Sequence, residues 1–73
     1  MRKYLDLIYT DTGQIHLFTH HDLMNGTLYG YHLRHYGHHS HSDLRKTEDG
    51  FGSAAAARAH GLSQLLQLAR KPL

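Results

Sequence analysis

A helical pattern marks one segment of this chain, and that segment lies at its C-terminal end. Ser53 suits a helix N-cap, because its hydroxyl can accept a backbone N–H of the first turn, and four alanines with high helix propensity follow it. Gly61 is the one interruption, and it leaves open whether the helix is kinked or split. We expect a helix over 53–71 with an apolar stripe that packs on the rest of the fold: Ala55, Ala59, Leu62, Leu66 and Ala69.

The residues before this helix are typical of β-strands. Two runs rich in β-formers flank Asp11-Thr12-Gly13 and predict a hairpin over 4–19. Asn25-Gly26 is a strong turn signal, and an aromatic-rich third strand is expected over 27–36, where Gly30 indicates a bulge or a close approach by the helix. A His-rich loop at 37–43, a short fourth strand at 44–46 and a turn at 48–50 complete the pattern.

The fold class that follows is α+β, with a three- to four-stranded antiparallel sheet and one C-terminal helix packed on one face. The chain has 73 residues and no cysteine, so we expect a single domain over 1–73 whose core is marginal, on the order of 3–5 kcal/mol, without a disulfide to staple it. A homodimer is one remaining route to stability. No apolar run resembles a signal peptide or a membrane span, and we expect a cytoplasmic protein.

One helix can cover only one face of a sheet, so the other face is expected to stay open. Strict alternation places one set of residues under the helix: Leu5, Leu7, Tyr9, Ile15, Leu17, Tyr29, Tyr31 and Leu33. The opposite set mixes aromatic, His and Arg side chains: Tyr4, Asp6, Ile8, His16, Phe18, His32, Arg34 and Tyr36. Such a face is suited to stacking and to pairing with phosphate or carboxylate, although ordinary cross-strand pairs would give the same composition.

The chain contains nine histidines, an unusual number for its length. His38, His39 and His41 are the weak candidates for metal ligands, and adventitious Zn or Ni binding would suit them. None of the familiar zinc-site spacings is present, and His32 and His35 lie on opposite faces of a strand, so no cofactor is predicted.

The motifs of catalysis and of DNA reading are incomplete. Ser40, His41, Ser42 and Asp43 are adjacent in sequence, but a catalytic triad requires convergence in space, and no enzyme activity is expected. The segment around Gly61 resembles the turn of a helix-turn-helix, but Gln67 and Arg70 stand where that pattern needs apolar residues. A single Ala-rich helix is the better interpretation.

A strand of the form Gly30-Tyr31-His32-Leu33-Arg34, followed by Asp49-Gly50-Phe51-Gly52-Ser53 and an Ala-rich helix, resembles small strand–strand–strand–helix proteins. These include the arm-binding domains of tyrosine recombinases and small phage or prophage accessory proteins, some of them anti-CRISPR proteins. The Lys/Arg-rich sheet of the recombinase domains is absent here. The resemblance implies an accessory or inhibitor protein and supplies no catalytic residue.

The predicted function is a non-catalytic binding module of this phage type that docks on a host protein or a protein–nucleic-acid complex. Its predicted contact residues are Tyr4, His16, Phe18, His32, Arg34, Tyr36, Arg45 and Lys46. Two alternatives stay open. One is direct DNA or RNA binding through the aromatic and basic face. The other is a His-based metal- or pH-responsive protein, because imidazoles titrate near a pKa of about 6.5.

Overall fold

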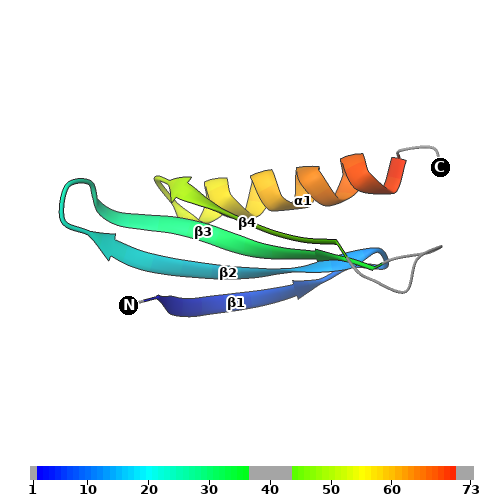
Figure 1. Cartoon of the computed structure of the whole chain (residues 1–73), viewed down its shortest axis with the longest axis horizontal. Coiled ribbons are helices and arrows are strands. Elements are labelled where there is room, and N and C mark those ends of the chain that lie inside the picture. Colours follow the sequence, from blue (N-terminus) through cyan, green and yellow to red (C-terminus); the bar gives the residue numbers. More distant parts are fainter. Residues whose placement is uncertain (1, 37–43, 71–73) are drawn as a thin grey trace.

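The computed structural model describes residues 2–36 and 44–70, which form a four-stranded antiparallel sheet and one helix (Figure 1). The elements are β1 (Lys3–Tyr9), β2 (Gly13–Asp22), β3 (Gly26–His35), β4 (Leu44–Phe51) and α1 (Ala54–Arg70). The strand order is β1-β2-β3-β4, so each strand pairs with its neighbour in sequence. The predicted α+β class is confirmed. No helix in the described ranges is long and apolar enough to cross a membrane.

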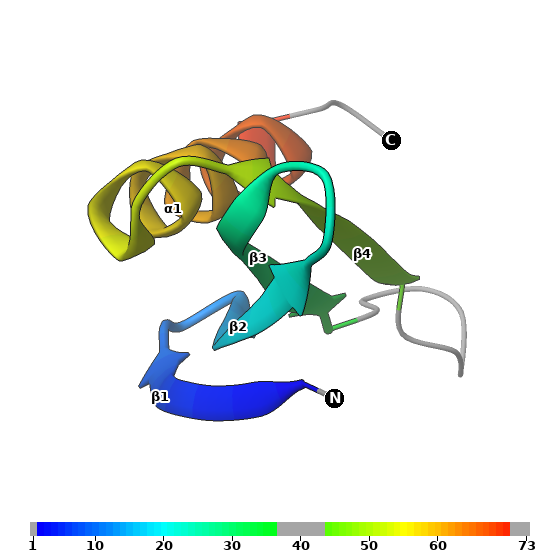
Figure 2. The ribbon, with the colours of Figure 1, turned by 90° about the vertical axis from the view of Figure 1, so that its left-hand side faces the viewer.

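The helix lies over one face of the sheet and contacts β2, β3 and β4 (Figure 2). The Ser53 hydroxyl accepts a hydrogen bond from the Ala56 backbone N–H at 3.1 Å, which confirms the predicted cap. The helix runs without a break through Gly61. Beneath it lies a core built from both layers: Ile15, Leu17, Tyr31, Leu33, Ala57 and Leu65.

The predicted apolar stripe of the helix is wrong except at Leu62, which is partly buried and packs against the core. Ala55, Ala59, Leu66 and Ala69 are exposed, whereas the buried positions are Ala57, Gly61 and Leu65. Gly61 explains the rotation, because a Cβ there would lie 2.7 Å from Cδ1 of Ile15. The glycine that looked like a helix breaker is therefore the point of closest approach between helix and sheet.

The predicted faces are correct for β2 and β3 and wrong for most of β1. Leu5 has no partner in β2, since the register shifts between Tyr4 and Asp6, and this bulge reverses the alternation beyond it. Leu7 and Tyr9 therefore lie on the face away from the helix, and Asp6 and Ile8 lie on the helix side. Within the described ranges α1 does not contact β1, which lies farthest from it (Figure 2).

The fourth strand is longer than expected. It continues through Glu48-Asp49-Gly50, which the sequence indicated as a turn. Tyr31 pairs with Glu48 and Tyr29 with Phe51, so two residues of β4 lie opposite Gly30 alone. Gly50 has a φ of 94°, a value that glycine adopts without strain. The turn signal therefore marks a β-bulge inside a strand. The predicted loop at 37–43 lies outside the described residues.

Candidate binding face

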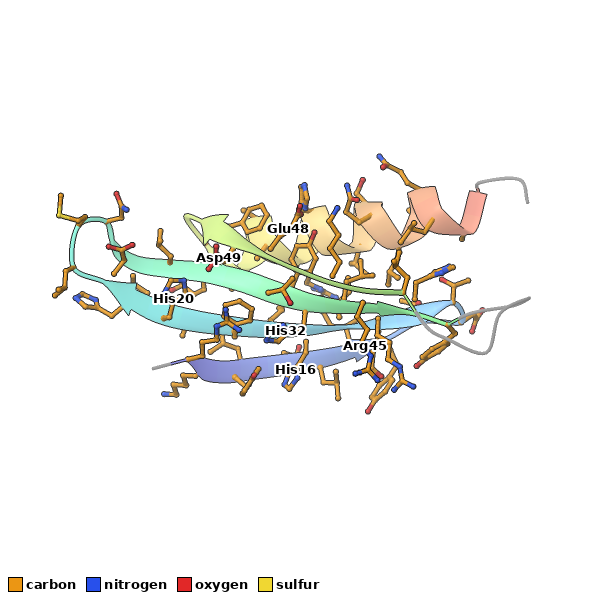
Figure 3. All side chains as sticks on the ribbon, in the orientation of Figure 1. His16, His20, His32, Arg45, Glu48 and Asp49 are labelled. Atoms are coloured by element: carbon orange, nitrogen blue, oxygen red, sulfur yellow. The ribbon has the colours of Figure 1, made fainter. Side chains whose placement is uncertain are left out.

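The side of the sheet away from α1 is called the open face. Its members follow from the cross-strand pairs, because residues directly opposite each other share a face. They include Tyr4, Leu7, Tyr9, Gln14, His16, Phe18, His20, His32, Arg34, Arg45 and Thr47. Asp49 lies in the bulge of β4 without a paired residue, and its contact with His20 places it on the same face. In Figure 3, His16 and Arg45 lie on the side of the sheet away from α1, whereas Glu48 lies on the side that faces α1.

One row of the open face crosses all four strands and carries two cations. Tyr9 pairs with Gln14, Gln14 with Arg34, and Arg34 with Arg45. Tyr36 adjoins this row: its ring lies 5.7 Å from the Arg34 guanidinium carbon, and its hydroxyl donates to Gln14 Oε1 at 3.5 Å. Like charges directly opposite on neighbouring strands repel each other. The two guanidinium groups give this row positive charge, which favours an anion beside Arg45.

A second row supplies imidazole and hydroxyl groups. Leu7 pairs with His16, His16 with His32, and His32 with Thr47. Nδ1 of His32 lies 2.8 Å from Oγ1 of Thr47, and Tyr4 stacks on His16 with ring centroids 4.2 Å apart. Burial, the nearby Arg2 guanidinium and His16 together lower the pKa of His32, which favours its neutral form.

Phe18 forms the floor of the third row. It is fully buried although no helix covers this face. The Arg2 guanidinium lies over its ring at 4.5 Å, the His32 ring is 4.8 Å away, and Gly30 opposite leaves the space that the ring fills. Phe18 was predicted to contact a partner through the open face. It belongs to that face, but its ring is buried and supports the exposed side chains from below, so the ring is not available for contact.

The two basic residues predicted in β4 point in opposite directions. Arg45 is exposed on the open face. Lys46 pairs with Leu33 on the helix side, where its Nζ lies 3.5 Å from Glu48 Oε1 and 3.5 Å from Gln64 Oε1. Lys46 was predicted as a contact residue in addition to the open face. Its side chain extends to the helix side, because adjacent residues of a strand face opposite sides, and its contact with a partner stays a prediction.

A groove of about 490 Å³ runs over the first two rows. It is lined by Gln14, His16, His32, Leu33, Arg34, Arg45, Lys46 and Thr47. Among the residues that the structure describes, the lining contains no carboxylate. Asp49 is on the open face, where it pairs with His20 at 3.1 Å, away from the groove. The groove therefore presents hydrogen-bond donors and positive charge together.

The structure also contains a polar cluster under the helix that the sequence did not predict. The buried Tyr31 hydroxyl donates to Glu48 Oε2 at 2.7 Å and lies 2.8 Å from Nδ1 of His60, which is itself 3.2 Å from the same carboxylate oxygen. The Tyr31 bond, with Lys46 and His60 nearby, lowers the pKa of Glu48, and burial raises the pKa of Tyr31. The sequence did not predict this cluster because a turn was expected at Glu48. A strand that continues through Glu48 places its carboxylate beside Tyr31.

The remaining histidines give no metal centre among the described residues, where no three His, Asp or Glu side chains converge. His38, His39 and His41, like Ser40, Ser42 and Asp43, lie outside the described residues. His32 and His35 are on opposite faces of β3, as predicted. In comparisons with known proteins, the chain matches no protein family, no curated protein and no solved structure.

Proposed function

We propose that this protein is a non-catalytic binding module whose open face docks on nucleic acid, free or within a protein–nucleic-acid complex. The observation that carries the proposal is the pair Arg34–Arg45, directly opposite each other at the edge of a groove whose described lining residues include no carboxylate. Phosphodiester backbones are the polyanions that arginine recognises best, because the guanidinium donates several N–H groups in one plane.

The aromatic and amide groups around the arginines support the same choice. Tyr9 is 68% exposed and Tyr4 52% exposed, and both lie on the open face. Exposed rings can stack on unpaired bases, while Gln14 offers an amide to a base edge or a phosphate. The function predicted from the sequence was docking on a host protein or a protein–nucleic-acid complex. The arrangement of the arginines favours nucleic acid instead, while an accessory or inhibitor role of the phage type stays a prediction.

Two arginines in different elements provide a matched test. Arg45→Gln and Arg58→Gln remove the same charge, one from the groove and one from an exposed position of α1 that is not part of the groove lining. Binding of labelled duplex DNA, single-stranded DNA and RNA would be measured by fluorescence anisotropy at about 50 to 200 mM salt, where phosphate contacts lose affinity steeply. We expect Arg45→Gln to weaken binding much more than Arg58→Gln. Equal effects, or no binding by the unaltered protein at the lowest salt, would contradict the proposal.

A protein partner is the second candidate, and one separate observation favours it. Leu23 and Met24 at the tip of the β2–β3 hairpin are 96% and 89% exposed. The Asp22 carboxylate accepts a bond from the Met24 N–H at 2.7 Å, which fixes the turn that presents them. Leu23→Ser with Met24→Ser should then reduce capture of a protein from nuclease-treated host lysate while nucleic-acid binding stays unchanged. Unchanged capture would remove this candidate.

A further inference from the structure

We infer that the groove of the open face binds a phosphate group, and that Arg45 and Thr47 are its principal donors. The inference rests on the proposed function and deepens it, because it assigns the groove to the nucleic-acid backbone and not to the bases. The two ring nitrogens of His32 have different partners.

The partners of His32 define its tautomer. Nε2 lies 3.4 Å from an Arg2 guanidinium nitrogen and 3.4 Å from the Tyr4 hydroxyl. Since a guanidinium can only donate, Nε2 must carry the lone pair and accept. Nδ1 therefore carries the proton and donates to Thr47 Oγ1 at 2.8 Å. The lowered pKa of His32, which favours the neutral ring, agrees with this assignment.

The tautomer of His32 determines whether the Thr47 hydroxyl donates or accepts a hydrogen bond in the groove. Its Oγ1 already accepts a hydrogen bond from His32, so its own O–H is oriented toward another acceptor. Thr47 lines the groove two residues after Arg45 on the same strand, and both side chains therefore lie on the same face. Within the described residues, no side chain comes within hydrogen-bond or ion-pair distance of the Arg45 guanidinium.

An oxyanion fits these donors better than a base edge does. Arg34, Gln14 and His16 line the same groove and add further N–H groups. Most base edges present donors beside acceptors, and the described lining of the groove has no carboxylate to accept from them. The N7–O6 edge of guanine presents acceptors only, and the sequence-dependence test below must separate it from a phosphate. A phosphate presents acceptors only. The chemistry of the groove therefore matches the backbone of DNA or RNA, whose contacts position a protein without reading sequence.

The test separates this inference from the proposed function. Arg45→Gln should lower affinity about tenfold, as expected for a charge-assisted hydrogen bond. The loss should be equal for duplexes of different sequence, and the salt dependence should decrease by about one phosphate contact. A loss that depends on sequence, with an unchanged salt slope, would overturn the phosphate assignment and leave nucleic-acid binding intact.

Thr47 offers a second variant at the same site. Thr47→Val keeps the shape and removes the hydroxyl, while Thr47→Ser retains it, so only the first should weaken binding. If no nucleic acid binds, titration with inorganic phosphate followed by NMR tests the groove alone. We expect shifts at Arg45 and Thr47 in the unaltered protein, and we expect Arg45→Gln to abolish the shift at Thr47 and Arg58→Gln to preserve it. Absence of such shifts, or an Nε2–H tautomer of His32 in ¹⁵N spectra, would contradict the inference.

Discussion

Replacing Gly61 with alanine has two opposite effects on the free energy of unfolding, and their magnitudes can be compared. In an exposed helix interior this change stabilises by about 1 kcal/mol, because glycine has the larger conformational entropy in the unfolded chain. At Gly61 the new Cβ would lie 2.7 Å from Cδ1 and 3.3 Å from Cγ2 of Ile15, and 3.3 Å from Cγ of Tyr31. Ile15 and Tyr31 are fully buried, so neither has room to move away.

Overpacking of this kind costs about 1–3 kcal/mol. The balance predicts that Gly61→Ala destabilises the protein by about 1 kcal/mol, equivalent to a melting temperature lower by roughly 4–8 °C for a domain of this size. Urea denaturation followed by circular dichroism would measure the difference. Ala59→Gly is the matched control, since Ala59 is exposed in the same helix and should lose about 1 kcal/mol from propensity alone.

A second substitution identifies the cause. Ile15→Val removes the Cδ1 atom nearest to the new methyl group, at its own cost of about 0.5–1.5 kcal/mol. In that background Gly61→Ala should become neutral or stabilising. If Gly61→Ala stabilises the unaltered protein by as much as the Ala59 control loses, the helix does not approach the sheet at this residue and the packing described above is wrong.

Three further predictions concern the polar cluster and the open face. Tyr31→Phe should cost about 1.5–3 kcal/mol in urea denaturation, because it removes the bond to the Glu48 carboxylate, and a loss below that range would contradict the geometry. The pKa of Glu48 is lowered in the folded state, so its contribution to stability is fully present above its usual pKa of about 4.5 and is lost as pH falls through the folded value. The stability difference between the unaltered protein and Glu48→Gln should therefore shrink below pH 4.5, and a constant difference would refute the assigned bond. Gly30→Ala should destabilise strongly and expose Phe18 to solvent, because the added Cβ would lie 2.6 Å from Cζ of that ring; a neutral result in thermal denaturation would contradict the close approach.

The fold was accessible from sequence because its local signals are strong. The Ser53 cap, the alanine run and the Asn25-Gly26 turn each depend on neighbouring residues alone, and each predicted the element that the structure contains. The faces of β2 and β3 followed from alternation. These strands are central in the sheet, where burial on one side fixes the register.

The wrong predictions concern positions where an irregularity of the backbone or a close contact between layers interrupts the regular sequence pattern. A bulge at Leu5 reversed the faces of β1, and a second bulge at Asp49 and Gly50 was taken for a turn. The rotation of the helix depended on Gly61, whose lack of a side chain matters only once Ile15 lies opposite it. Each of these features is decided by a partner distant in sequence. Single-sequence patterns carry no information about such partners.

The length of β4 links the errors to the candidate site. A strand that ends at Lys46 places no residue beside His32 or Tyr31, so neither Thr47 nor Glu48 can be assigned a face. In the observed strand, alternation sends Arg45 and Thr47 to the open face and Lys46 and Glu48 to the helix side. Glu48 is thereby held by Tyr31 and His60 beneath the helix, which keeps its negative charge out of the groove. The same alternation that builds the polar cluster therefore leaves the groove positive, and the capacity of the open face to bind an anion depends on the register of this one strand.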